Sequence, residues 1–182
     1  SPGFLVVFTV SVVAVVAQDL IVVYLPLLGT ERNIAVDVIG SLLAVRAFAA
    51  VVSRLFFAKL SEWLGSTRLM MLSTVAGAAA FAALAAPISL PAMYVAIAML
   101  GGALGVAVTT AISSLLGLVS SEVRGTANSL RTTGTRLGQV VIPFFAGLLA
   151  TAMGVASVFL VLGASLAMAA TAVQFTRAKS PS

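Results

Sequence analysis

The sequence predicts an all-α polytopic membrane protein, one domain over residues 1–182 with six transmembrane helices. Six apolar runs carry this prediction, at residues 4–25, 38–57, 69–86, 90–118, 130–152 and 155–175. A helix needs roughly 20 apolar residues to cross a bilayer core about 30 Å thick. The runs lack the alternation of barrel strands, and only helices or closed barrels satisfy every backbone group in lipid. We therefore expect helices.

The composition agrees with lipid as the solvent. Hydrophobic residues make up 61% of the chain and charged residues 8%, whereas soluble domains have about 25% charged residues. The net charge of +5 could indicate nucleic acid, but the basic residues flank the apolar runs and form no separate patch. A lipid bilayer is the better partner, and no nucleic acid is expected. Cysteine and histidine are absent, so neither a metal site nor another cofactor is expected.

The loops predict the orientation of the chain. The loops after 38–57 and 90–118 with the adjoining ends of the runs, together with the tail, hold eight basic residues: Arg54, Lys59, Arg68, Arg124, Arg131, Arg136, Arg177 and Lys179. The opposite side has one basic residue, Arg32, accompanied by Glu31 and Asp37. This bias places both termini in the cytoplasm and the protein in the cell (inner) membrane. No basic segment precedes 4–25, so no signal peptide is expected.

Two ionisable residues interrupt the apolar runs. Asp19 lies about 9 Å from the outer end of 4–25, and Arg46 lies about 12 Å from the outer end of 38–57. Antiparallel neighbours would bring them to similar depth, with Gln18 beside them. Because charges at membrane depth face a protein interior or water, the two residues form an ion pair or face one aqueous cavity. A purely structural pair stays open as an alternative.

The runs 90–118 and 130–152 are rich in small residues. Gly101, Gly105, Thr109, Ser113 and Gly117 recur at every fourth position, and such rows let helices approach closely in lipid. The hydroxyls of Thr109, Thr110 and Ser113 are candidates for contact with a polar ligand. The run 130–152 adds Gly134 and Gly138 for packing, Pro143 for a kink, and Gln139 as a second polar group. The runs 69–86 and 155–175 are the best candidates to face lipid.

One loop and one helix junction carry a family resemblance. The segment AKLSEWLGSTR, residues 58–68, resembles the loop signature of the major facilitator superfamily, G-x-L-[AS]-D-R-x-G-R-[RK]-[RK]. Four residues match and one replaces the aspartate conservatively: Leu60, Ser61, Gly65 and Arg68, with Glu62 as the replacement. The stretch from Glu122 to Gly138 is similar to the junction between the tenth and eleventh helices of such transporters.

The resemblance implies the C-terminal six-helix half of a secondary transporter, built from two inverted three-helix repeats. The first and fourth helices would line the cavity, the second and fifth the seam between halves. Asp19, Gln18, Arg46, Thr109, Thr110, Ser113 and Gln139 would then belong to the substrate or proton pathway. Arg54, Glu62, Gly65, Arg68 and Arg124 would form the cytoplasmic gate, with Glu62 approaching Asn128 and Ser129 of the other half.

The expected function is secondary active transport of a small molecule by alternating access, as one half of a 12-helix assembly. A second copy of the chain or a missing N-terminal half would supply the other wall. The alternative is a membrane module, or an excised half, that folds and oligomerises without moving substrate. An intramembrane enzyme is not expected, because the chain has no histidine and only one deeply placed acid.

Overall fold

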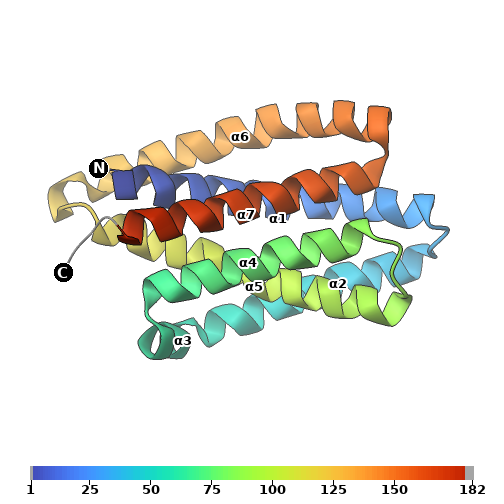
Figure 1. Ribbon diagram of the computed structural model, residues 1–182, viewed down its shortest axis with the longest axis horizontal. Coiled ribbons are helices and arrows are strands. Elements are labelled where there is room, and N and C mark those ends of the chain that lie inside the picture. The colour runs from blue at the N-terminus through green and yellow to red at the C-terminus, as the bar shows by residue number, and fades with distance from the viewer. Residues whose placement is uncertain (1, 179–182) are drawn as a thin grey trace.

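The computed structural model describes residues 2–178, which form a bundle of helices joined by short connections (Figure 1). The elements are α1 (Pro2–Glu31), α2 (Val36–Leu55), α3 (Phe57–Leu64), α4 (Ser66–Ala85), α5 (Leu90–Gly117), the 3-10 helix η1 (Ser121–Val123), α6 (Arg124–Met153) and α7 (Val155–Ala178). All except α3 and η1 are long and apolar enough to cross a membrane. The predicted all-α polytopic fold is confirmed.

The connections alternate between the two ends of the bundle (Figure 1). The start of α1, the end of α7, α3 and η1 lie at one end, which we call the terminal end. The connections α1–α2, α4–α5 and α6–α7 lie at the other, which we call the far end. Since α1 leaves the terminal end whereas α5 leaves the far end, the units α1–α4 and α5–α7 run in opposite directions through the membrane.

The two units exchange their second helices. α2 packs mainly against α5 and only lightly against α1, whereas α6 packs mainly against α1. α4 and α7 pack against each other and against α5 and α1 respectively. Each unit therefore completes the other, and neither three-helix unit buries its own faces alone.

The core lies where α1, α4, α5 and α7 meet. Leu20, Phe81, Leu104 and Phe159 are almost completely buried there. The rings of Phe81 and Phe159 join α4 to α7 with centroids 6.0 Å apart. Because lipid is as apolar as these side chains, close packing stabilises this core more than exclusion from water does.

The helices do not end where the apolar runs end, and the two largest differences are in α1 and α6. α1 continues through Pro26 as far as Glu31, and α6 begins at Arg124 rather than at residue 130. α3 is a short helix inside the loop that follows α2, where no helix was predicted. Hydropathy marks only the part of a helix that lies in hydrocarbon, so polar turns beyond that part escape it.

At the far end, two neighbouring residues at the end of α1 form hydrogen bonds to α4 and α7. The guanidinium of Arg32 donates to the carbonyl oxygens of Leu84 (2.8 Å) and Ala85 (3.2 Å) at the end of α4. The backbone N–H of Val155, at the start of α7, donates to a carboxylate oxygen of Glu31 at 3.3 Å. Positive charge at a helix C-terminus and negative charge at an N-terminus are both favourable.

Candidate functional site

Three polar side chains lie at similar depth in the bundle. Asp19 is twelve residues from the far end of α1, or about 18 Å along the helix. Arg46 is ten residues from the far end of α2, about 15 Å, and Gln139 is fourteen residues from the far end of α6, about 21 Å. Half of a bilayer core is about 15 Å. All three therefore lie near the middle of the membrane.

Asp19 and Gln139 are joined directly, and Arg136 completes a chain of hydrogen bonds. Nε2 of Gln139 donates to Oδ2 of Asp19 at 2.5 Å. The Arg136 guanidinium donates to Oε1 of Gln139 at 3.2 Å. The amide thus uses its donor end on the anion and its acceptor end on the cation. This chain links α1 to α6 at mid-membrane depth.

The expected direct ion pair between Asp19 and Arg46 is not present within residues 2–178. The prediction assumed that consecutive helices pack side by side, but α2 packs against α5 and α6 takes the place beside α1. The side chain that reaches the carboxylate of Asp19 is therefore Gln139 and not Arg46. The charge of Asp19 still attracts Arg46, and Arg54 repels it. The shared aqueous cavity stays a prediction.

Arg46 and Gln18 both have donors without acceptors. Nε of Arg46 and Nε2 of Gln18 are buried, and neither has a hydrogen-bond partner. Arg46 belongs to the packed side of α2, because its backbone lies against Gly101 of α5. Buried donors usually find an acceptor, so these two atoms mark an incomplete polar site.

The three candidate hydroxyl residues of α5, Thr109, Thr110 and Ser113, lie closer to the terminal end. Thr110 is completely buried and Thr109 is half-buried, and their hydroxyls donate to the carbonyls of Val106 (2.8 Å) and Gly105 (2.9 Å). Ser113 is exposed. The donors of the two threonines are therefore used inside α5, and of the three residues Ser113 has the most accessible hydroxyl.

Two buried hydroxyls were missed in the sequence. The hydroxyls of Ser11 in α1 and Thr135 in α6 are buried without a hydrogen-bond partner. α1 and α6 run in the same direction, and Gly134 lies beside Phe8, so the two hydroxyls lie at about the same level. Isolated hydroxyls in apolar runs carry no signal by themselves. Only the pairing of α1 with α6 relates them.

A family model described as Major Facilitator Superfamily matches residues 7–182, nearly the whole chain. The chain belongs to the major facilitator superfamily. It is a multi-pass membrane protein of a transporter family, and its general function is membrane transport. A search of curated proteins found no match to the chain.

The loop signature of the superfamily lies on α3 and the start of α4. Gly65 separates the two helices with φ +75°, a left-handed conformation that glycine adopts without steric cost. Its N–H donates to the carbonyl of Ser61 at 3.0 Å and closes α3. The signature glycine is thus explained by a backbone turn that allows α4 to begin one residue after α3 ends.

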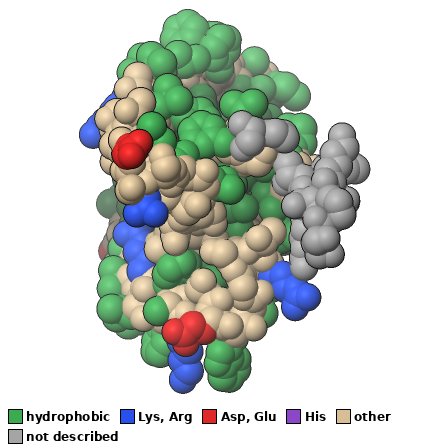
Figure 2. Space-filling model, turned by 90° about the vertical axis from the view of Figure 1, so that its left-hand side faces the viewer, with side chains coloured by type: hydrophobic (Ala, Val, Ile, Leu, Met, Phe, Trp, Pro, Cys, Tyr) green, Lys and Arg blue, Asp and Glu red, His purple; other side chains and the backbone are tan. Residues whose placement is uncertain are grey.

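The charged residues of this region are exposed at the terminal end, which carries basic and acidic side chains near its edge (Figure 2). Arg54, Glu62 and Arg68 make no ion pair with one another in the part of the chain that is described. Arg124 is also exposed, and its Nε donates to the carbonyl of Leu116, near the end of α5, at 3.2 Å. Glu62 therefore has its carboxylate available for a contact outside the chain.

Glycines bring α5 against the backbone of α2. A methyl group on Gly101 would lie 3.0 Å from the carbonyl carbon of Arg46 and closer still to its oxygen. A methyl group on Gly105 would lie 2.7 Å from the Ser53 hydroxyl and 3.1 Å from the Ala50 carbonyl oxygen. The absence of side chains at these glycines allows the two helices to approach closely.

The glycines of α6 meet side chains of α1 instead. A methyl group on Gly134 would lie 2.5 Å from the tip of the Phe8 ring. One on Gly138 would lie 3.1 Å from Val16 and 3.3 Å from Val12. These glycines also allow close approach, but the atoms that face them belong to side chains of α1, which can change rotamer.

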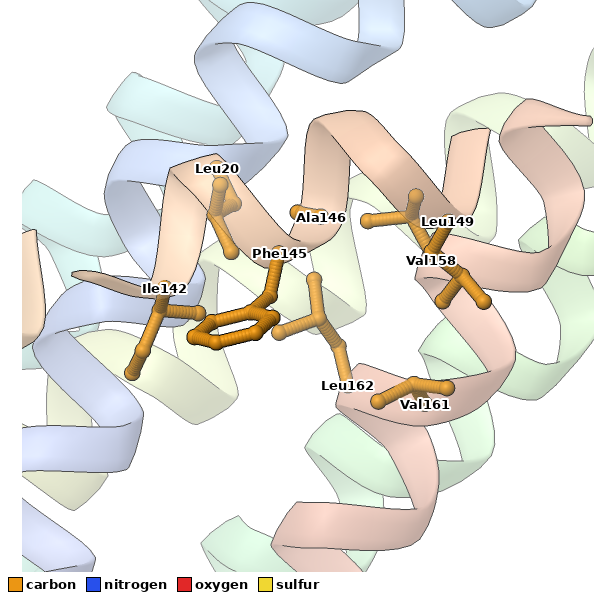
Figure 3. Close-up of a pocket in the computed structure, with 8 residues that line it drawn as sticks. All are labelled: Leu20, Ile142, Phe145, Ala146, Leu149, Val158, Val161 and Leu162. Carbon is orange, nitrogen blue, oxygen red and sulfur yellow. The ribbon is translucent and has the colours of Figure 1, made fainter. Parts of the chain in front are cut away.

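An apolar pocket of about 110 Å³ lies between α1, α6 and α7 (Figure 3). One of its lining residues, Ile142, directly precedes Pro143. Its walls are hydrocarbon: Leu20, Ile142, Phe145, Ala146, Leu149, Val158, Val161 and Leu162. α6 continues through Pro143 without a break. The pocket lacks polar groups and is separate from the chain that joins Asp19 to Arg136.

Proposed function

We propose that this chain is one half of a secondary active transporter that moves a small molecule by alternating access. The observation that carries the proposal is the set of polar side chains near mid-membrane on α1, α2 and α6. Ionisable groups at this depth face water or protein, not lipid. In transporters of this kind the substrate binds near the midplane, between repeats.

A second half would complete the pathway. α6 and α2 are the least buried spans, with 6% and 17% of their apolar windows buried inside the chain. Exposed apolar faces can rest in lipid, but Arg136 on α6 is also exposed, and a guanidinium at this depth needs protein or water around it. We therefore propose that α2 and α6 form the seam with the other half.

The other half is proposed to be a second copy, related by a two-fold axis along the membrane normal. Both copies would then direct their terminal ends to the cytoplasm. Because α6 begins at Arg124, its N-terminus lies four residues before Asn128, where the apolar run had suggested it. Glu62 is thus proposed to approach the first turn of the partner's α6, where a carboxylate is favoured by about 0.3–1 kcal/mol.

Crosslinking tests this arrangement. The described residues include no cysteine, so only the introduced cysteines can form a disulfide there. Cysteines replacing Glu62 and Thr126 should give a covalent dimer on a denaturing gel after mild oxidation. The matched control pair, Asp37→Cys with Thr126→Cys, joins opposite ends and should stay monomeric. A detergent-purified monomer with no crosslink would contradict the homodimer and favour a different polypeptide as the other half.

Asp19 is proposed as the acid of any proton-coupled step. It is the one acid of the described residues near mid-membrane, since the other acids lie at the two ends of the bundle. Proteoliposomes with the full chain and a pH-sensitive dye inside would be offered sugars, amino acids, organic anions and organic cations. Asp19→Asn should abolish proton-driven uptake and leave counterflow exchange, whereas Glu122→Gln should change neither.

Two outcomes would contradict these proposals separately. Proton-driven uptake unchanged in Asp19→Asn would reject the role of Asp19 and leave transport standing. No uptake of any class, with a crosslinked dimer present, would indicate a membrane module that assembles without transporting.

The orientation is proposed from the basic residues at the terminal end. A membrane-impermeant maleimide added to intact cells should label Asp37→Cys and spare Lys59→Cys. Labelling of Lys59→Cys alone would reverse the orientation.

A further inference from the structure

The charges near mid-membrane do not balance. Asp19 accepts from Gln139, and Gln139 accepts from Arg136, so this acid and this base already share one chain. Arg46 is outside that chain and makes no hydrogen bond or ion pair with any described residue. One positive charge at mid-depth is therefore left with no anion in direct contact, although the charge of Asp19 still acts on it.

Lipid phosphate is poorly placed to supply that anion. Arg46 lies about 15 Å from the far end of α2, and its backbone is pressed against Gly101 on the packed side of the helix. Its Nε is buried. The headgroups at the far end are therefore at the limit of what its side chain can reach.

A second buried donor without an acceptor lies on α1 at a comparable depth. Nε2 of Gln18 is buried without an acceptor, and it lies about 20 Å from the far end of α1. The unsatisfied groups of α1 and α2 at this level thus lack acceptors, not donors. A ligand that completes them must bring oxygen atoms, and the cation favours a negative charge on those oxygens.

We infer that Arg46 binds the carboxylate or phosphate group of an anionic substrate, with Gln18 as a second donor. The inference rests on the proposed transport function and names its substrate class. A planar guanidinium binds two anionic oxygens at once, which lysine does not. Arg46→Lys therefore keeps the charge and loses the paired geometry.

Binding is tested first, independently of flux. Sodium benzoate and inorganic phosphate, each added to the purified full chain in detergent, are the probes, with sodium chloride at equal ionic strength as the reference. At least one probe should raise the melting temperature of the wild type by several degrees. Arg46→Gln should lose the shift, and the matched control Arg131→Gln, near the terminal end of α6, should keep it.

Flux is tested second, in proteoliposomes with radiolabelled benzoate or phosphate against glycerol and choline. We expect uptake of an anion to fall at least tenfold in Arg46→Gln and less in Arg46→Lys, with Arg131→Gln unchanged. Size-exclusion profiles identify variants that fold. If Arg46→Gln fails to fold, Arg46→Lys and Gln18→Leu carry both measurements.

Three outcomes would overturn the inference. Uptake of glycerol or choline alone would leave transport standing and reject the anion. Equal melting shifts in wild type and Arg46→Gln would also reject it. A melting temperature that depends on anionic lipid through Arg46, with no response to the soluble probes, would assign the charge to a lipid phosphate. If no compound is transported, the melting shifts still decide whether Arg46 binds an anion.

Discussion

The contact of α2 with α5 and the contact of α6 with α1 occupy equivalent places in the two inverted units, yet they are built differently. In the first, glycines of α5 lie against the backbone of α2, at Arg46 and Ala50. In the second, glycines of α6 lie against side chains of α1, at Phe8 and Val12. Backbone atoms can move only if the whole helix moves, whereas side chains can change rotamer. The same small residues thus give two kinds of contact inside the chain. We call the contact of α2 with α5 the rigid seam and the contact of α6 with α1 the adaptable seam.

The polar groups follow the same division. Beside the adaptable seam, Gln139 bridges Asp19 and Arg136 and holds α6 to α1. Beside the rigid seam, Arg46 is placed by its backbone and has no partner for its side chain. One seam is held by a polar contact that can open, and the other presents a charge at a fixed position. Such a division agrees with the proposal that Arg46 of α2 binds a ligand.

The largest effect is expected at the rigid seam. Gly101→Ala should lower the free energy of unfolding by about 1–3 kcal/mol, because the added methyl group meets the Arg46 carbonyl and α2 must shift. Thermal unfolding in detergent measures the loss. Gly117→Ala is the matched control in the same helix, since nothing lies within 4 Å of the added methyl group. An equal loss in both variants would mean that helix approach is not the cause.

An intermediate effect is expected at the polar bridge. A double-mutant cycle of Asp19→Ala with Gln139→Ala should give a coupling free energy of about 1 kcal/mol, since the hydrogen bond joins a charged and a neutral group. The parallel cycle of Asp19→Ala with Arg46→Ala should give less than half of that, because no direct bond joins the two. A larger coupling free energy in the second cycle would support a direct ion pair between Asp19 and Arg46.

The smallest effect is expected at the adaptable seam. Gly134→Ala should cost less than about 1 kcal/mol, because the ring of Phe8 can turn away from the new methyl group. Combining Gly134→Ala with Phe8→Leu should remove most of that cost. If Gly134→Ala lowers the free energy of unfolding as much as Gly101→Ala does, the two seams do not differ in rigidity.

Much of the fold was predictable because lipid imposes a simple rule on each span. Six long apolar runs required six helices, and the helices are present. The degraded loop signature still identified Gly65, since its left-handed turn accepts few other residues. Rows of small residues predicted helix packing, and in the structure Gly101 lies against Arg46 and Gly134 against Phe8.

The pairing of helices was not predictable from the order of the chain. Asp19 and Arg46 match in depth, but the exchange of second helices between the units places Gln139 beside Asp19. Nothing local in the sequence encodes that exchange. Ser11 and Thr135 were missed for the same reason, because a buried hydroxyl becomes notable only when its surroundings show no acceptor. α3 was missed because eight residues with mixed polarity carry no transmembrane signal.

Glu31 and Arg32 give the end of α1 a role in the order of assembly. The carbonyls that Arg32 binds belong to residues 52 and 53 positions later, and the N–H that Glu31 binds lies 124 positions later. During synthesis the N-terminal part emerges first, so the Arg32 contact can form once α4 is in the membrane, and the Glu31 contact only after α7 begins. Two adjacent residues thereby form their contacts in sequence, the first within the unit α1–α4 and the second with α7 of the other unit, once the start of α7 has been made.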